Sequence, residues 1–330
     1  MKKITIIGVE MDLGQSRRGV DMGPNALRYA ELDSRLRRLG YPLEDHGNIK
    51  VPNREMLTTP HATNTPSGKS SQLADPREDS HRAALAGEAS TGGKLDFLPS
   101  VAGVCREIYR IGRSVIAAGQ LPIFLGGDHS IAVGSIGGVT HCEPVGVLWI
   151  DAHGDFNTPA TSPSGNLHGM PLATLLGHGA PEWVDVGRAG PKLAADRVVL
   201  IGIRDLDGQE RQLLVKSGVT FYTMRDIDEL GIATVANKAL ERLSHLSHLH
   251  VSLDMDVLDP AEAPGVGTPV YGGLTYREAH LLMEVIADRA HVCSIDVVEI
   301  NPILDHRNHT SELAVNLVAS LLGQAREATF

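Results

Sequence analysis

Three short clusters of acidic and imidazole side chains carry most of the chemistry that this sequence could perform. They are Gly126–Ser130 (GGDHS), Asp151–Asn157 (DAHGDFN) and Asp254–Asp256 (DMD). In the second cluster Asp and His alternate along the chain, so an extended backbone presents their side chains on one side. The two acids of the third cluster are spaced in the same way. Each of these two clusters can therefore aim several ligand atoms at one point.

A divalent metal is the partner that these side chains need. Carboxylates at this density repel one another and lose their hydration when buried, so a positive charge must lie among them. Lys and Arg do not occur in the three clusters, which argues against a network of salt bridges. Oxygen and imidazole ligands without sulfur suit Mn²⁺ better than structural zinc. The ligand candidates, enough for two ions that share carboxylates, are His129, Asp151, His153, Asp155, Asp254 and Asp256.

Each motif alone also has an ordinary structural explanation. A single Asp-x-His can be a polar turn at the end of a strand, and GGDHS can be a tight turn around a hydrogen-bonded histidine. Short motifs produce many false matches, so either one alone has about even odds of being structural. Three such clusters, each at the end of a strand, favour a site.

Two other patterns predict no site. The glycine-rich stretch from Gly8 to Gly23 has no GxGxxG motif and no downstream acid in register, which argues against a dinucleotide site. His245, His248 and His250 resemble a metal-binding tract, yet no carboxylates accompany the first two. We expect these histidines to be solvated at the surface.

Each cluster begins where a buried strand is expected to end. Short apolar runs predict strands at Ile4–Gly8, Leu121–Leu125, Val145–Ile150, Val198–Ile203, Thr220–Thr223, His250–Leu253 and Cys293–Val298. Amphipathic stretches lie between them, such as Val101–Ala118, a predicted helix that Gly119 closes. The carboxyl ends of parallel strands form the ligand crevice of such a sheet, so the clusters can converge there. Glu299, after the last strand, adds a fourth polar group at the same edge.

Apolar strands that alternate with helices predict an α/β fold with a parallel sheet covered on both faces. We expect one three-layer α/β/α domain over residues 1–330, with a mostly parallel central sheet. A polar insertion at about residues 53–95 interrupts this pattern, and from Thr58 to Ser80 its only large apolar residue is Leu73. A mobile surface insertion is the favoured interpretation, and a lid or subunit contact is the alternative.

Composition excludes several classes of function. Lys and Arg number 30 against 40 Asp and Glu, and the net charge of -10 argues against binding to nucleic acid or to an anionic membrane surface. The three cysteines, Cys105, Cys142 and Cys293, lie far apart and indicate neither a disulfide framework nor a thiolate zinc site. The first apolar run is too short for a signal peptide, and no later run is long enough to span a membrane. We expect a cytoplasmic protein.

These motifs resemble the signatures of the ureohydrolases, the binuclear manganese family that includes arginases and agmatinases. GGDHS, DAHGDFN, SLDMDVLDP and EINP occur in the family's order, and the resemblance covers nearly the whole chain. Within the family the chain resembles the bacterial arginases most, because agmatinases usually lack the string SGNLHG at Ser164–Gly169. RRGVDMGPNALR, PGVGTPVYGGLTYRE and NPILDHRN indicate the same branch. The third signature commonly has a glycine where this chain has Val257.

The resemblance implies an arginase-like fold and a cofactor of two Mn²⁺ ions. The first ion would be held by His129, Asp151, Asp155 and Asp254, and the second by Asp151, His153, Asp254 and Asp256. A hydroxide that bridges the ions would attack the guanidinium carbon of L-arginine and release L-ornithine and urea. Glu299 would orient the guanidinium, His168 would transfer protons, and Asp155 would complete the catalytic set.

The resemblance also implies residues for substrate binding. Asn157, Ser164 and Asn166 would bind the α-carboxylate, and Asp207 would contact the α-amino group with Glu210 nearby. Thr268 would lie beside the metals. A homo-oligomer, either a trimer or a hexamer, is implied in the same way.

Two other functions stay open at this point. The first keeps the chemistry but changes the substrate to agmatine, guanidinobutyrate or another guanidino acid. The second is a catalytically silent member of the family that acts as a metal-binding regulatory protein.

Overall fold

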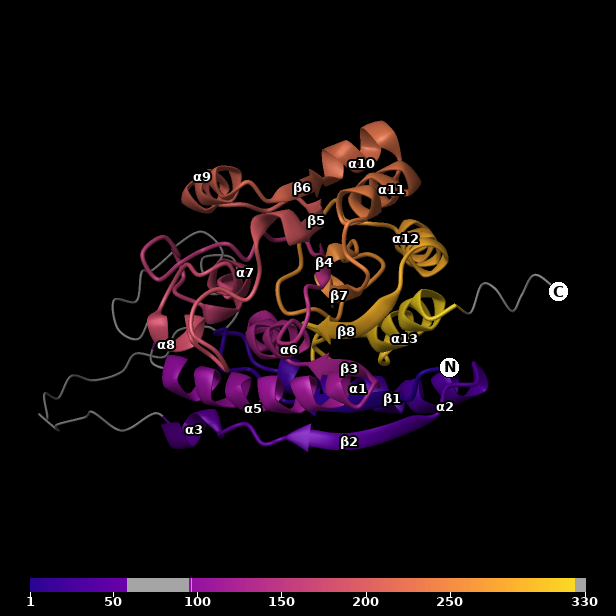
Figure 1. Cartoon of the computed structure of the whole chain (residues 1–330), viewed down its shortest axis with the longest axis horizontal. Helices are drawn as coiled ribbons and strands as arrows, with labels where there is room; N and C mark the ends of the chain where they lie inside the picture. Colours follow the sequence, from indigo (N-terminus) through magenta and orange to yellow (C-terminus); the bar gives the residue numbers. More distant parts are fainter. Residues whose placement is uncertain (58–94, 96, 324–330) are drawn as a thin grey trace, which may run out of the picture.

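Eight strands form one central sheet in the computed structural model, which describes residues 1–57, 95 and 97–323 (Figure 1). Their spatial order is β2-β1-β3-β8-β7-β4-β5-β6, and every recorded pairing between them is parallel. The strands are β1 (Ile4–Val9), β2 (Leu43–Ile49), β3 (Leu121–Gly126), β4 (Gly146–Ile150), β5 (Val198–Ile203), β6 (Thr220–Thr223), β7 (Leu249–Asp254) and β8 (Val292–Val298). The predicted α/β fold with a parallel sheet is confirmed.

Burial of apolar runs explains six of the seven strands that the sequence predicts; the seventh, β6, lies at an edge of the sheet and is half-buried. In β1, β3, β4, β5 and β7 every residue is buried, as expected for strands covered on both faces. The eighth strand, β2, lies at the edge of the sheet and has the sequence LEDHGNI, in which only Leu43 and Ile49 are buried. Because most side chains of β2 are polar and exposed, a search for apolar runs does not detect this strand.

Helices cover both faces of this sheet in two layers (Figure 1). The first layer contains α5 (Leu98–Ala117), α6 (Ala132–Val139), α7 (Pro171–Leu175) and α8 (Pro181–Val184). The second contains α1 (Gly23–Tyr29), α2 (Leu32–Arg38), α10 (Met224–Leu230), α11 (Ile232–Arg242), α12 (Tyr276–Arg289) and α13 (His309–Leu321). Two further α-helices in the described part of the chain are α3 (Arg54–Leu57) and α9 (Gly208–Ser217). The predicted helix Val101–Ala118 corresponds to α5, and Gly119 follows it with a positive φ of 71°.

Alternating strand residues divide the core into two apolar clusters, one on each face of the sheet. In β4, for example, Leu148 and Ile150 pack toward α11 and α12, while Val147 and Trp149 pack toward α5 and α6. The strand that supplies the second motif is therefore anchored on both faces. This anchoring holds the residues at its carboxyl end in a fixed position.

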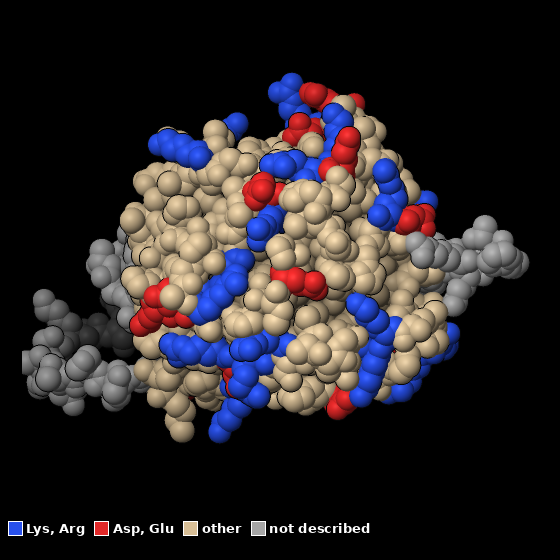
Figure 2. Space-filling view, in the orientation of Figure 1, with Lys and Arg blue, Asp and Glu red and all other residues tan. Residues whose placement is uncertain are grey.

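Several predictions concern the periphery of the fold. The predicted insertion from Thr58 to Ser80 lies outside the described residues. All three cysteines are free thiols, as expected. Among the described helices, none combines the length and apolar character that crossing a membrane would need. On the face that carries α5, basic side chains are interspersed with acidic ones (Figure 2).

Candidate metal centre and substrate pocket

The first cluster is positioned by a close approach of two loops. The amide of Asp128 donates to the carbonyl of Met11 (2.8 Å), and a Cβ at Gly127 would collide with that carbonyl. Asp128 also accepts from the amide of Gly14 (2.7 Å). These contacts explain the glycine at position 127, and a Cβ at Gly126 would meet the side chains of Val298 and Ile131. They also fix the short 3₁₀ helix His129–Ile131, which follows β3 after two residues.

His129 aims one ring nitrogen into a ring of carboxylates. Its Nδ1 lies 3.1 Å from Asp151 Oδ2, 3.2 Å from Asp155 Oδ2 and 3.1 Å from Asp254 Oδ2. This nitrogen is buried and has no hydrogen-bond partner among the described residues, and the ring stacks on Trp149 with centroids 4.1 Å apart. Burial disfavours an imidazolium here, yet the three carboxylates raise the pKa of His129 well above its usual range. The pKa direction shows how strongly this position attracts positive charge.

A second group of ligand atoms adjoins the first. His153 Nδ1 lies 3.1 Å from Asp256 Oδ2 and 3.4 Å from Asp151 Oδ1. Asp151 thus faces His129 with one oxygen and His153 with the other. Thr268 donates to Asp256 Oδ2 (3.0 Å), as expected for a threonine beside the site. Within each of the two groups, ligand atoms lie within 4.8 Å of one another, and Asp151 is common to both.

The pKa values of the acids reflect their crowding. Burial raises the pKa of Asp155 to about 6, and the charge of Asp151 adds to this effect. Burial and neighbouring carboxylates also raise the pKa of Asp254 well above its usual range. Asp151 differs, because the two histidines outweigh its burial and lower its pKa. The unpartnered buried nitrogen of His129 among carboxylate oxygens fits a divalent cation at the first position, and the converging ligand atoms of His153, Asp151 and Asp256 fit one at the second.

Glu299 and His168 form a second buried pair beside this cluster. Glu299 Oε1 accepts from His168 Nδ1 (2.9 Å) and from the amide of His129 (2.9 Å), while Oε2 accepts from Gln15 Nε2 (2.8 Å). Despite its burial, His168 has a pKa raised to about 9 by the Glu299 carboxylate. The pKa of Glu299 is lowered, because the positive charge of His168 outweighs the effect of burial. Near neutral pH the pair therefore holds a proton on His168.

Two acids of the site have unusual backbone conformations. Asp155 has a φ of 49° and Glu299 has a φ of 65°, a region that residues other than glycine seldom adopt. The carbonyl of Asp155 accepts from the first turn of α7, through Leu172 (3.1 Å) and Ala173 (3.3 Å). The amide of Glu299 donates to the carbonyl of Gly127 (2.9 Å). These bonds hold both side chains at strained positions, as is common at functional sites.

A pocket of about 260 Å³ opens above the cluster. His153, Asp155, Asp254 and His168 belong to its wall. The predicted substrate-binding residues line it too, namely Asn157, Ser164, Asn166, Asp207, Glu210 and Thr268. The structure thus brings all six together. The remaining predicted residues are buried and are not part of the pocket wall: His129, Asp151, Asp256 and Glu299.

Hydrogen bonds link the outer part of this pocket. Asn157 Nδ2 donates to Asp207 Oδ2 (2.8 Å), and Asp207 Oδ1 caps the start of α9 by accepting from the amides of Gln209 (3.0 Å) and Glu210 (2.9 Å). Glu210 accepts from the amide of Phe156 (2.9 Å), and burial raises its pKa to about 8. An ammonium group placed here would favour the charged form of Glu210.

Comparison with known proteins decides the family. The profile described as the Arginase family matches residues 2–323. The chain belongs to the arginase family. It is 46% identical to the arginase of Bacillus caldovelox over 326 residues, which cover 98% of this chain and 99% of that one. It is 45% identical to the arginase of Bacillus subtilis (strain 168) over 324 residues, 98% of each chain. The crystal structure of arginase from Bacillus cereus superposes with a TM-score of 0.84 at 43% identity, covering 98% of this chain and 99% of that one.

The departure from the family's third signature has a simple packing explanation. Val257 is fully buried, and its Cγ2 lies where a Cβ on Gly202 would be. Gly202 has a positive φ of 101° in β5, so it leaves room for the larger residue. The loop after β7 therefore accommodates valine next to the acids of this arginase-family site.

Three residues of the site carry no expectation from the sequence. Ser162 and Asp205 line the pocket, and Gln15 is 2% exposed and donates to Glu299. Asp205 follows β5, so the rule that polar residues gather after strands could have found it. Gln15 lies in the loop after β1, but a lone glutamine there has no chemical signature.

Proposed function

We propose that this protein is an arginase that hydrolyses L-arginine to L-ornithine and urea with two Mn²⁺ ions. The observation that carries the proposal is that two groups of His and carboxylate ligand atoms share the buried Asp151 and adjoin a polar pocket. Full-length identity of 46% to an arginase supports the choice of substrate within the family.

The donor set suits two hard divalent cations. His129, Asp151, Asp155 and Asp254 would hold one Mn²⁺, and Asp151, His153, Asp254 and Asp256 would hold the other. Such a pair supplies a hydroxide nucleophile near neutral pH, because it lowers the pKa of a water molecule. Carboxylate and imidazole donors favour Mn²⁺ over ions that prefer sulfur.

Glu299 and His168 would handle the guanidinium and the proton. Glu299 offers a carboxylate to a planar cation, and its two oxygens are already held in place by Gln15 and the amide of His129. His168 lines the pocket with a proton on Nδ1 that Glu299 stabilises. We infer that His168 donates a proton to the departing amine of ornithine, which must leave as a neutral or protonated group.

The outer pocket would select an amino acid rather than a simple amine. Asn157, Ser164 and Asn166 present amide and hydroxyl groups that can bind the α-carboxylate. Asp207 and Glu210 present acidic groups for the α-amino group. Agmatine lacks the α-carboxylate, so it would lose the first set of contacts.

A substrate panel with Mn²⁺-loaded protein tests this proposal. Urea release should be at least about 100-fold faster per mole of enzyme with L-arginine than with agmatine or guanidinobutyrate, since several polar contacts would be left unpaired. A preference for agmatine or another guanidino compound would replace arginase by that activity. Urea release from none of them, with two ions bound, would indicate a catalytically silent member of the family.

We also propose a cytoplasmic homo-oligomer in which residues 1–330 form one domain. The free thiols Cys105 and Cys293 are buried and suit a reducing compartment, and one family profile matches residues 2–323. Light scattering coupled to gel filtration should give the mass of a trimer or hexamer of the 35.3 kDa chain. A monomer would contradict the oligomer.

A further inference from the structure

One face of strands β7 and β8 is polar although it lies at the centre of the protein. His250, Ser252, Ser294 and Asp296 are all 0% exposed and lie on the face that α6 covers. Strand register places Ser252 opposite Asp296 and His250 opposite Ser294. On the other face, the same two strands present only apolar side chains, namely Val251, Leu253, Ile295 and Val297. The expectation that His250 is solvated at the surface is therefore wrong.

These polar residues form a continuous path to the candidate metal centre. Asp296 Oδ2 lies 3.2 Å from His250 Nε2 and accepts a hydrogen bond from Ser135 Oγ of α6 (2.7 Å). The hydroxyl of Ser252 donates to the same oxygen over 3.5 Å. Ser252 Oγ also lies 2.9 Å from His129 Nε2. Two hydroxyl groups thus donate to one carboxylate oxygen, the His250 ring nitrogen lies beside that oxygen, and one of the hydroxyls continues the path to His129.

The donor order along this path follows from the chemistry of its ends. A carboxylate only accepts, so the hydroxyl hydrogen of Ser252 is directed at Asp296. Ser252 can then only accept from His129, which places the ring hydrogen on Nε2. Nδ1, on the opposite side of the ring, is left with a free lone pair among the three carboxylates. This is the tautomer that a metal ligand requires.

We propose that the buried Asp296–His250 pair, acting through Ser252, holds His129 in its metal-binding tautomer and sets the affinity of the ion on that side. The inference rests on the metal-dependent function proposed above. Asp296 and His250 are positioning residues in this scheme, because neither touches the cluster itself.

Because Asp296 is fully buried, its carboxylate needs polar neighbours to hold it in place. A charge at 0% exposure loses its hydration and needs a compensating partner in place. The hydroxyls of Ser135 and Ser252 donate to this carboxylate. The His250 ring lies beside it with Nε2 3.2 Å away, and the other ring nitrogen lies 2.7 Å from Ser294 Oγ. Well-packed apolar residues could fill the same space at no loss of stability, so packing alone does not explain the pair.

The test measures Mn²⁺ binding by titration of metal-free protein. Wild-type protein should bind two ions. In Asp296→Asn and in Ser252→Ala, one ion should bind about 10- to 100-fold more weakly and the other should stay within about twofold. Because both changes break one path, the double variant should be no weaker than the single ones. At saturating Mn²⁺, kcat should return to within about threefold of the wild type, whereas the half-saturating Mn²⁺ concentration stays high.

Ser320→Ala is the matched control, since it removes a hydroxyl of equal burial that contacts the ring of His280 and no residue of the path. Its Mn²⁺ affinities should stay within about threefold of the wild type, below the range expected for loss of an outer-shell partner. Unchanged affinity for both ions in Asp296→Asn and Ser252→Ala would overturn the inference, as would effects that multiply in the double variant. Wild-type protein that binds no Mn²⁺ would contradict the proposed function itself and would overturn the inference with it.

Discussion

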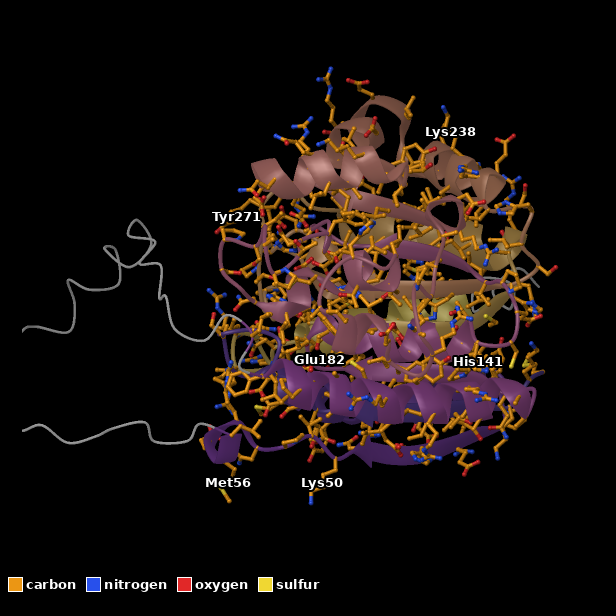
Figure 3. The ribbon with its side chains drawn as sticks, turned by 60° about the vertical axis from the view of Figure 1, so that its left-hand side comes forward. Lys50, Met56, His141, Glu182, Lys238 and Tyr271 are labelled. Carbon is orange, nitrogen blue, oxygen red and sulfur yellow. The ribbon has the colours of Figure 1, made fainter. Side chains whose placement is uncertain are left out.

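Strands β4, β7 and β8 have ionisable residues just outside both of their ends. The residues before these strands are Glu143, His248 and His291, and the residues after them are Asp151, Asp256 and Glu299. In Figure 3 the labelled Tyr271, from the loop after β7, lies on one side of the molecule, and His141, which precedes β4, lies on the other. The same strands thus offer similar residue types to two opposite edges of the sheet.

The two edges of the sheet differ in how deeply their ionisable side chains are buried and in how many carboxylates surround each histidine. At the amino ends, His248 Nδ1 lies 3.3 Å from Glu143 Oε1 and the rings of His248 and His291 lie 4.8 Å apart. Glu143 is exposed and His248 is half-buried, so only one carboxylate, itself open to water, faces the buried Nδ1 of His248. At the carboxyl ends, three carboxylate oxygens surround one fully buried nitrogen. Residue type alone therefore does not mark a metal site; buried ligand atoms that converge without another counter-charge do.

The largest expected effect comes from substituting one histidine at each edge of the sheet and comparing the two variants. His129→Asn should lower Mn²⁺ occupancy and arginine hydrolysis together, the latter by about 100- to 1000-fold, because a metal ligand is worth several kcal/mol. Bound metal and urea release measure the two effects. His248→Asn, at the amino ends, is the control and should leave both within about twofold, in the range of surface changes. Full activity of His129→Asn with one ion bound would contradict the paired-metal scheme.

Removal of metal should destabilise the protein through the carboxyl-end cluster. At a free concentration 100 times Kd, each bound ion stabilises the folded state by about 2.7 kcal/mol. Chelation should therefore lower the melting temperature by several degrees, to be measured by differential scanning calorimetry. In Asp151→Asn, which removes the carboxylate shared by both groups, chelation should shift the melting temperature far less. An equal shift in this variant would indicate that the metal binds elsewhere.

The His168–Glu299 pair should make stability depend on pH. The folded-state pKa of His168, about 9, exceeds the unfolded value of about 6.5. Protonated His168 thus contributes on the order of 3 kcal/mol to the free energy of unfolding. This contribution is complete below about pH 6.5 and is lost as the pH rises through about 9. Glu299 has a lowered pKa, so its contribution is present above the ordinary glutamate pKa and lost as pH falls below it.

The variant Glu299→Gln tests whether the Glu299 carboxylate is the group that raises the pKa of His168. The histidine NMR titration of metal-free Glu299→Gln should return the pKa of His168 from about 9 toward its usual range. Between pH 7 and pH 10 the wild type should lose more unfolding free energy in urea than the variant does. A His168 titration that is unchanged in the variant would show that another group holds its proton.

The smallest expected effect concerns the rim of the pocket. Ser164 is exposed there, and its hydroxyl accepts from the amide of Asn166 (3.2 Å). Ser164→Ala should raise KM for arginine by up to about tenfold, the worth of one hydrogen bond, with less change for agmatine. Steady-state kinetics on both substrates gives the comparison. The exposed Ser247, at the amino-end side, supplies the control Ser247→Ala, and an equal change in both variants would remove the proposed role of Ser164.

The sequence predicts those parts of the structure that depend on residues adjacent in the chain. Strands such as β4 are visible because their apolar residues are adjacent in the chain, and the Asp151–Asn157 motif is visible because it follows one directly. Edge strand β2 is not visible, since solvent accepts its polar side chains. The burial of His250 depends on strand register and on α6, which a single segment does not reveal. For the same reason Asp296 gives no signal in the sequence.

Crystals grown with Mn²⁺ and measured at the manganese absorption edge test the two-edge comparison most directly. We expect two anomalous peaks at the carboxyl ends of β4 and β7, one beside His129 and one beside His153, with Asp151 touching both. The amino-end residues Glu143 and His248 should carry no peak. A single peak, or peaks at the amino ends with none beside His129, would contradict the paired-metal centre.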